Sequence, residues 1–258
     1  MLTLKQIQDT YPDIPNQDFY LRSILVEYIQ HELLDSIFKQ EKSDLLSFIG
    51  GTALRIVYGG NRFSEDLDFD NFGLSFEDFK IMLENVVVDM KSKGFDIEFR
   101  FIEKKAYHCY IKFPHILQNN SLSPNDREKI LIRIDTVTKD IKTEKETFLL
   151  DKFEILRNIF VNTRPILLSQ KLIAITERKR EKGRDFYDVS FLYGNSNPDF
   201  SFIEASTGLN RKQFMDKVID RCQGLNFLSL AEDVKPFLVR PEQILRVETF
   251  LEFIKTKV

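Results

Sequence analysis

The chain has 258 residues, of which 43% are hydrophobic, and its formal net charge is −3. This length suits one large domain or a catalytic domain with a smaller companion, and the apolar content is enough for a core. A net charge this small excludes a globally basic nucleic-acid-binding protein, so any basic surface must be local. Phe occurs 24 times and Trp is absent, which predicts a core packed largely with phenylalanine rings.

The cysteine count and the hydropathy indicate the cellular compartment of the protein. Cys109 and Cys222 are too few for a disulfide scaffold, and although they could pair in principle, reduced thiols are favoured. No apolar run approaches the roughly 20 residues that cross a bilayer, and no signal-peptide core follows the polar N-terminal residues. We therefore expect a cytoplasmic protein with no membrane contact.

Hydrophobic periodicity predicts alternating helices and strands in the first 160 residues. A long helix is expected over residues 17–40, capped by Asn16 or a neighbour. The other expected helices cover residues 52–58 and 76–91. Strands are expected at residues 45–49, 66–70, 95–103, 107–113 and 129–138. The third and fourth strands form a hairpin around Lys104 and Lys105, and a polar loop occupies residues 119–126.

After about residue 160 the pattern becomes helical. Pro165 suits a helix start, and a loop is expected at residues 195–199. The expected helices cover residues 166–180, 185–193, 210–222, 228–236 and 241–257. We therefore predict an α+β protein, with a mixed sheet flanked by helices in residues 1–160 and a C-terminal helical bundle in residues 161–258 that contributes to the active site.

A glycine pair separates the first predicted strand from the following short helix. Gly50 and Gly51 allow a tight turn and close backbone approach. If a helix begins at Thr52, its free N–H groups point into the turn and favour an anion such as a triphosphate. A hydroxyl donor could come from Thr52 or Ser64. The turn is therefore a candidate phosphate-binding element.

Carboxylates alternate with apolar residues directly after this unit. Asp66 and Asp68 lie two apart on a predicted strand, so their side chains share one face. Two such carboxylates can hold magnesium ions that also bind nucleotide phosphates. Asp135 lies on the less apolar face of its strand and is the candidate third carboxylate, as a metal ligand and possibly a general base. Asp70 continues the acidic face and is expected to support the others or to be solvated.

The residues from Gly50 to Leu54, followed by the run Gly-Gly-Asn-Arg-Phe-Ser-Glu-Asp-Leu-Asp-Phe, carry a family resemblance. They resemble the AbiEii/AbiGii abortive-infection toxin family of nucleotidyltransferases and, more distantly, the polymerase-beta-like superfamily. Gly51 stands where the superfamily has serine, a form typical of the toxin family. One hydroxyl contact to phosphate is therefore either missing or supplied by Thr52 or Ser64. The resemblance implies a nucleotidyltransferase-type fold.

A second segment resembles the family's downstream pattern. It runs Lys-Leu-Ile-Ala-Ile-Thr-Glu-Arg from Lys171 to Arg178, and then Gly-Arg-Asp-Phe-Tyr-Asp up to Asp188. The resemblance, which covers about residues 40–195, makes Lys171 a nucleotide phosphate contact and Asp188 or Asp185 a further site residue. Helical spacing agrees, because Lys171 and Arg178 share one face and the two aspartates could orient Lys171 or Arg184. The alternative is a surface helix with an Arg–Asp salt bridge.

Two weaker patterns are further candidates for binding sites. Residues 171–184 hold six Lys or Arg and two Glu, a local surplus of four positive charges that suits either RNA or nucleotide phosphates, or a solvated helix end. His108, Cys109 and His115 lack a fourth ligand and the spacing of a zinc site, so we do not expect zinc.

These patterns predict a magnesium-dependent nucleotidyltransferase that moves a nucleoside monophosphate from a nucleoside triphosphate to an acceptor hydroxyl. The predicted catalytic residues are Asp66, Asp68, Asp135, Lys171 and Asp188, with the first three as metal ligands. The predicted nucleotide-binding residues are Gly50, Gly51, Thr52, Ser64, Lys171, Arg178 and Asp185. The resemblance also implies a toxin with a cognate antitoxin and an RNA acceptor, plausibly the 3′ end of tRNA. Transfer to a protein or small molecule, or nucleotide binding without turnover, are the alternatives.

Overall fold

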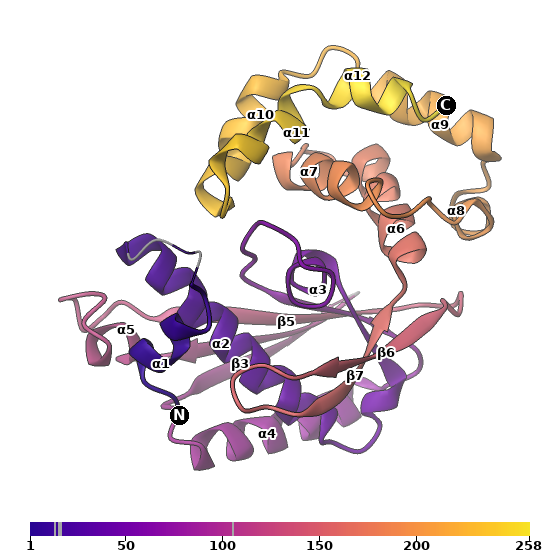
Figure 1. Cartoon of the computed structure of the whole chain (residues 1–258). Helices are drawn as coiled ribbons and strands as arrows, with labels where there is room; N and C mark the ends of the chain where they lie inside the picture. Colours follow the sequence, from indigo (N-terminus) through magenta and orange to yellow (C-terminus); the bar gives the residue numbers. More distant parts are fainter. Residues whose placement is uncertain (13, 15–16, 105) are drawn as a thin grey trace. The chain divides into compact units, whose positions relative to one another are not determined.

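The computed structural model describes residues 1–258 except 13, 15, 16 and 105, and the chain divides into two compact units (Figure 1). The first unit contains Met1–Ala53, Phe63–Asp140 and Glu146–Val161. The second unit contains Leu54–Arg62, Ile141–Lys145 and Asn162–Val258. Within the described residues, no helix combines the length and hydropathy needed to cross a membrane.

A seven-stranded sheet forms the centre of the first unit, in the order β3-β4-β5-β2-β1-β7-β6. Its strands are β1 (Leu46–Ile49), β2 (Leu67–Asn71), β3 (Glu98–Glu103), β4 (Tyr107–Phe113), β5 (Ile130–Thr138), β6 (Lys145–Leu150) and β7 (Arg157–Asn162). Strand β2 pairs antiparallel with β1 and parallel with β5. The sheet is therefore mixed, which confirms the predicted fold class.

Two helices of the first unit pack through phenylalanine rings on one face of this sheet. The helices before residue 120 are α1 (Leu4–Asp9), α2 (Asp18–Phe38), α3 (Gly50–Ile56), α4 (Phe76–Ser92) and α5 (Ile116–Asn119). Phe38 of α2 packs on Phe69 of β2 with ring centroids 6.2 Å apart, and Phe79 of α4 packs on Phe101 of β3 at the same separation. Figure 1 shows α4 running along the sheet. Phenylalanine rings thus fill the core, as their abundance predicted.

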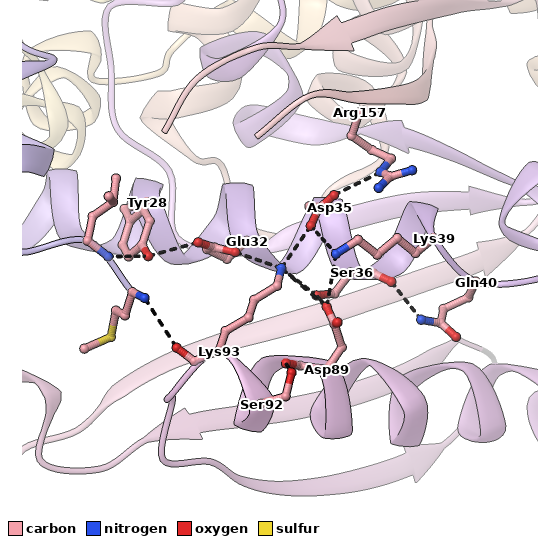
Figure 2. Close-up of polar contacts among 12 residues, drawn as sticks. Tyr28, Glu32, Asp35, Ser36, Lys39, Gln40, Asp89, Ser92, Lys93 and Arg157 are labelled. Atoms are coloured by element: carbon pink, nitrogen blue, oxygen red, sulfur yellow. Dashed lines mark hydrogen bonds and ion pairs between the residues drawn. The ribbon is translucent and has the colours of Figure 1, made fainter. Parts of the chain in front are cut away.

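An ionic network ties α2 to α4 and to β7 (Figure 2). The Lys93 ammonium, just past the end of α4, lies 2.8 Å from Glu32 and 2.9 Å from Asp35, both on α2. Asp35 also pairs with Lys39 at 2.6 Å and with Arg157 at 2.9 Å. Burial raises the pKa of the Asp35 carboxyl, but the hydrogen bonds from these cations outweigh it and lower that pKa to about 2.

Most predicted elements of the first unit are present, with shifted ends. The helix expected at residues 52–58 begins two residues earlier, because Gly50 itself turns the chain into α3. The strand expected from residue 95 begins only at Glu98. Strands β6 and β7 and the short α1 and α5 were not predicted, since each is short or lacks a clear apolar period. Asn16 and the Lys105 part of the expected hairpin turn lie outside the described residues.

The second unit is helical, as the composition predicted. Its helices are α6 (Arg164–Glu177), α7 (Gly183–Leu192), α8 (Phe200–Thr207), α9 (Arg211–Cys222), α10 (Phe227–Val234), α11 (Leu245–Glu248) and α12 (Phe250–Lys255). The rings of Phe186, Phe227 and Phe250 meet at its centre, with centroids 5.0–5.9 Å apart. This unit therefore has its own aromatic core.

One helix of the second unit was missed and one expected helix was wrong. Helix α8 was not predicted, although Asp199 caps it by accepting from the Phe202 N–H. The single helix expected at residues 241–257 is broken into a 3₁₀ turn at Pro241–Ile244 and the short helices α11 and α12. Cys222 of this unit and Cys109 of the first are both free and buried, in agreement with reduced thiols.

Candidate active site

The glycine turn lies directly against the acidic strand. Strand β1 ends at Ile49, which is paired with Asp68 of β2, and the chain then turns at Gly50 with a φ of 79°. A Cβ atom at position 50 would lie only 2.4 Å from an Asp68 carboxylate oxygen. Only glycine allows both the positive φ and this close approach. The turn and the carboxylate therefore meet at one place in the first unit.

The pairing of β2 with β5 brings the predicted carboxylates together. Asp68 lies opposite Asp135 in this parallel pair, and Leu67 lies opposite Ile134. Because residues opposite each other point to the same face, Asp68 and Asp135 share the polar face of the sheet. Asp66, half-buried just before β2, is on that face too.

Asp70 continues the acidic alternation but is fully buried, so the expectation that it might be solvated was wrong. One of its oxygens lies 3.6 Å from the Lys139 ammonium, just beyond the end of β5. This contact links the ends of two neighbouring strands. Asp70 thus lies deeper in the fold than the half-buried Asp66 and Asp68.

Two cationic or ionisable side chains contact these carboxylates and were not predicted to do so. The Arg133 guanidinium of β5 lies 3.0 Å from Asp66 and 2.8 Å from Asp135. His108 of β4 places Nδ1 2.7 Å from the other oxygen of Asp135. Burial lowers the pKa of Arg133, but the charges of Asp66 and Asp135 outweigh this and raise it. The alternation of β5 already placed Arg133 on the face of Asp135, which was the available signal.

A zinc site at His108 is not formed. His108 points to the polar face, whereas its neighbour Cys109 is fully buried and alternates to the opposite face. His115 is separate, at the start of α5 with a φ of 59°.

The carboxylates suit a hard divalent cation in chemistry and charge. Three aspartate side chains offer the oxygen ligands that Mg²⁺ prefers. In the described part of the chain, no three His, Cys, Asp or Glu side chains are already gathered as a metal site. The Arg133 guanidinium instead occupies the place between Asp66 and Asp135, as a cation held by the same oxygens. The residues therefore fit a magnesium ion, provided that the guanidinium yields this place.

The two candidate hydroxyl donors differ in their surroundings. Thr52 is buried, and its hydroxyl donates to the backbone carbonyl of Asp66, which ties the start of α3 to the approach to β2. Ser64 is half-buried, and its backbone carbonyl accepts from the Gln30 side chain at 2.9 Å. Gly51, the second glycine of the turn, is buried.

The second predicted motif forms a buried ionic cluster in the second unit. The Lys171 ammonium on α6 lies 3.2 Å from Asp185 and 2.8 Å from Asp188, both on α7. Arg178, just past the end of α6, pairs with Asp185 at 2.8 Å. Both aspartates are almost fully buried, whereas 42% of the Arg178 side chain is exposed. The aspartates thus orient Lys171, one of the two options that their spacing left open.

Arg62 completes this cluster and was missed in the sequence. Its Nε and one Nη each lie 2.7 Å from a different oxygen of Asp188, a bidentate pair in which both side chains are buried. Burial raises the pKa of Asp188, but the charges of Arg62 and Lys171 lower it to about 2. Arg62 stands four residues before Asp66, so its place in the first motif was a signal, but its partner 126 residues away was not visible.

Comparisons with known proteins agree on the fold. JHP933 from Helicobacter pylori is 18% identical with a TM-score of 0.56, and the match covers 92% of this chain and 93% of that one. A putative nucleotidyltransferase from H. pylori is 19% identical with a TM-score of 0.56, covering 92% and 96%. MenT4, a nucleotidyltransferase toxin from Mycobacterium tuberculosis H37Rv, is 16% identical with a TM-score of 0.58, covering 99% and 90%.

The sequence comparison identifies the family. No curated protein sequence matches this chain. The family model described as "Nucleotidyl transferase AbiEii toxin, Type IV TA system" matches residues 32–250, a range that contains both predicted motifs. The chain therefore belongs to the AbiEii family of nucleotidyltransferase toxins of type IV toxin–antitoxin systems.

Proposed function

We propose that this protein is a magnesium-dependent nucleotidyltransferase that transfers a nucleoside monophosphate from a nucleoside triphosphate to an acceptor hydroxyl. The observation that carries the proposal is the register of β2 and β5, which sets Asp68 beside Asp135 and against the Gly50 turn. The family match over both motifs supports the same chemistry.

In this proposal, the polar face of the first unit binds the metal and orients the reacting groups. Asp66, Asp68 and Asp135 hold Mg²⁺, which when bound neutralises phosphate charge and makes the acceptor hydroxyl more acidic. The small residues Gly50 and Gly51 let the triphosphate approach the backbone, and Ser64 offers it a hydroxyl. Thr52 contributes indirectly, because its hydroxyl holds the backbone of Asp66.

The transfer step forms a phosphate ester bond and breaks a phosphoanhydride bond. The acceptor oxygen attacks the α-phosphorus and forms a new P–O bond. The bond from the α-phosphorus to the oxygen that bridges it to the β-phosphorus breaks, and pyrophosphate leaves with that electron pair. Asp135 accepts the proton of the attacking hydroxyl. The carboxylates thereby position the reactants and remove the proton.

For the second unit, we propose that Lys171 and Arg178 bind phosphate oxygens. Lys171 and Arg178 both pair with Asp185, so this one carboxylate holds two cations side by side, an arrangement that suits an anion. The two aspartates keep the ammonium in place, and Arg62 holds Asp188. Lysine supplies a mobile point charge of the kind that suits a polyphosphate.

We further propose that the acceptor is RNA, at the 3′ end of tRNA, and that a cognate antitoxin opposes the activity in the cytoplasm. The membership of a toxin family of type IV toxin–antitoxin systems supports the antitoxin. The surplus of positive charge in residues 171–184 suits an RNA backbone.

The test is to incubate the protein with Mg²⁺, total RNA and each of the four nucleoside triphosphates labelled at the α-phosphate. We expect label on RNA together with pyrophosphate release. The double variant Asp66→Asn, Asp68→Asn should lose at least about 10³-fold in rate, because the metal ligands act on charge that develops in the transition state.

The exposed turn residue Asp126 provides a matched control, since Asp126→Asn removes a carboxylate that is not one of the predicted site residues and should leave the rate unchanged. Label on a protein or on a small molecule would show that the acceptor is not RNA, while the nucleotidyl-transfer reaction would still stand. A failure to release pyrophosphate with any acceptor would refute the nucleotidyltransferase proposal. Equal labelling by the double variant would refute the metal-ligand roles.

A further inference from the structure

Arg133 occupies the centre of the carboxylate group. It stands one position before the Ile134–Leu67 pair, so the strand register places it beside Asp66. Its guanidinium contacts Asp66 at 3.0 Å and Asp135 at 2.8 Å, and its own backbone N–H donates to the second oxygen of Asp66 at 3.3 Å. One side chain therefore engages two of the three carboxylates proposed to hold metal.

The guanidinium and a divalent cation compete for these oxygens. The planar guanidinium lies against one oxygen of Asp66 and one of Asp135, and a second cation held by the same oxygens would be repelled by its charge. Nδ1 of His108 lies 2.7 Å from the other oxygen of Asp135, so both oxygens of this carboxylate are already contacted. Metal binding at Asp66 and Asp135 therefore requires that the guanidinium moves away.

The structure allows this movement. The Arg133 side chain is 36% exposed, so its long stem can turn toward solvent without opening the core. Removing the guanidinium leaves Asp66 and Asp135 without the cation that they share, which is costly unless another cation arrives. The exchange of one cation for another keeps this face compensated.

We propose that Arg133 is an internal counter-cation that competes with the divalent metal for Asp66 and Asp135. It compensates these carboxylates in the metal-free protein and releases them when metal binds, so it weakens metal binding before a nucleotide arrives. This inference rests on the proposed function, because it assumes that these carboxylates hold metal. Once released, the guanidinium is a cation beside the polyphosphate, so nucleotide favours the metal-bound arrangement.

The test measures binding of Mn²⁺ to the full chain without nucleotide, from the loss of the electron paramagnetic resonance signal of free Mn²⁺. We expect Arg133→Met to bind Mn²⁺ about tenfold more tightly than the unsubstituted protein, because two partly exposed ion pairs no longer have to be broken. Arg133→Lys, which keeps the charge but loses the fork, should be intermediate and serves if the methionine variant does not fold.

Arg100 is the matched control for a nonspecific charge effect. It lies on β3 in line with Tyr110 and Arg133, so it shares their face of the sheet. Its guanidinium lies over the Tyr110 ring, 4.8 Å from the centroid, and not between the carboxylates. Arg100→Met removes the same charge and should tighten Mn²⁺ binding much less than Arg133→Met.

The outcomes separate the inference from the proposed function. Equal Mn²⁺ affinity in the unsubstituted protein, Arg133→Met and Arg100→Met would overturn the competition while the metal site stands. Mn²⁺ binding that survives Asp68→Asn unchanged, or no binding in any variant, would overturn the metal site and the inference with it. As a second measurement, Mn²⁺ should raise the melting temperature of Arg133→Met more than that of Arg100→Met.

Discussion

Two charged regions of the first unit differ in how their charges balance. The network in Figure 2 sets three carboxylates against three cations, and its members contact one another across α2, α4 and β7. The residues of this network are Glu32, Asp35, Asp89, Lys39, Lys93 and Arg157. On the polar face of β2 and β5, two carboxylates, those of Asp66 and Asp135, share the Arg133 guanidinium.

The difference separates structural charge from functional charge. A balanced and mutually hydrogen-bonded network satisfies its own members and fixes the packing of the elements that carry it. A group with an excess of one sign is costly to maintain and gains from a ligand of the opposite sign. On this criterion the network stabilises the fold, whereas the carboxylate face is available for a cation. If this distinction holds, substitutions in the network change stability and substitutions on the carboxylate face change activity.

The largest expected effect is on activity, from Asp68→Asn. We expect nucleotidyl transfer to fall by about 10³-fold, equivalent to about 4 kcal/mol of transition-state stabilisation. The free energy of unfolding should change by less than about 1 kcal/mol, because one carboxylate fewer relieves repulsion on an acidic face. Initial rates and urea denaturation measure the two quantities. A loss of stability that matches the loss of activity would contradict the functional assignment of this face.

The opposite pattern is expected from Lys93→Met in the network. This change leaves Glu32 and Asp35 without their shared ammonium, in side chains that are only about a tenth exposed. We expect the free energy of unfolding to fall by about 3 kcal/mol, while the rate per folded molecule is unchanged. Lys91 is an exposed lysine of the same helix, and Lys91→Met should change neither quantity. A loss of activity in the folded Lys93→Met variant would contradict a purely structural role of the network.

The sequence predicted those parts of the site that depend on local periodicity. The alternation of residues 66–70 and 129–138 placed Asp66, Asp68 and Asp135 on the less apolar faces of two strands, and β2 and β5 have those faces. The glycine pair predicted the turn. These features follow from the period of a strand and from the conformational freedom of glycine, which neighbouring residues alone determine.

The contacts between distant segments could not be predicted in the same way. Arg133 meets Asp66 only because β2 pairs with β5 in one register, and Arg62 meets Asp188 across 126 residues. No local pattern reports which strands pair or which helices pack. The short strands β6 and β7 were missed for a related reason, because an irregular apolar pattern becomes a strand only when a neighbour supplies hydrogen bonds.

The network should also set the response of the first unit to acid. The pKa of Asp35 is lowered to about 2 in the folded chain, below its ordinary value of 3.8. A lowered folded pKa adds stability that is complete above about pH 4 and is lost as the pH falls toward about 2. We expect Asp35 to contribute about 2 kcal/mol in this way. Urea denaturation of the unsubstituted protein and Asp35→Asn should therefore converge between pH 4 and pH 2. A constant difference across this range would contradict the assignment.

The smallest expected effect on stability comes from alanine substitutions at two glycines, Gly50 and Gly59. These two substitutions test most directly whether the position of the Asp68 carboxylate matters for activity. Gly50 and Gly59 both have positive φ, 79° and 70°, so alanine at either position should cost about 1 kcal/mol of folding free energy. Their surroundings differ, because a Cβ at position 59 meets open space whereas one at position 50 meets the Asp68 carboxylate.

Gly50→Ala should therefore displace Asp68 and lower the rate of nucleotidyl transfer. Gly59→Ala should keep the rate and lose only the folding free energy that a positive φ costs an alanine. Circular dichroism melting gives the stability of both variants, and initial rates with labelled nucleotide give the activity. Because the strain of the backbone is the same in both, any difference in rate reports on the position of one carboxylate. Equal rates in the two variants would mean that the contact between the turn and Asp68 is a matter of packing, and the acidic face would then need another explanation than catalysis.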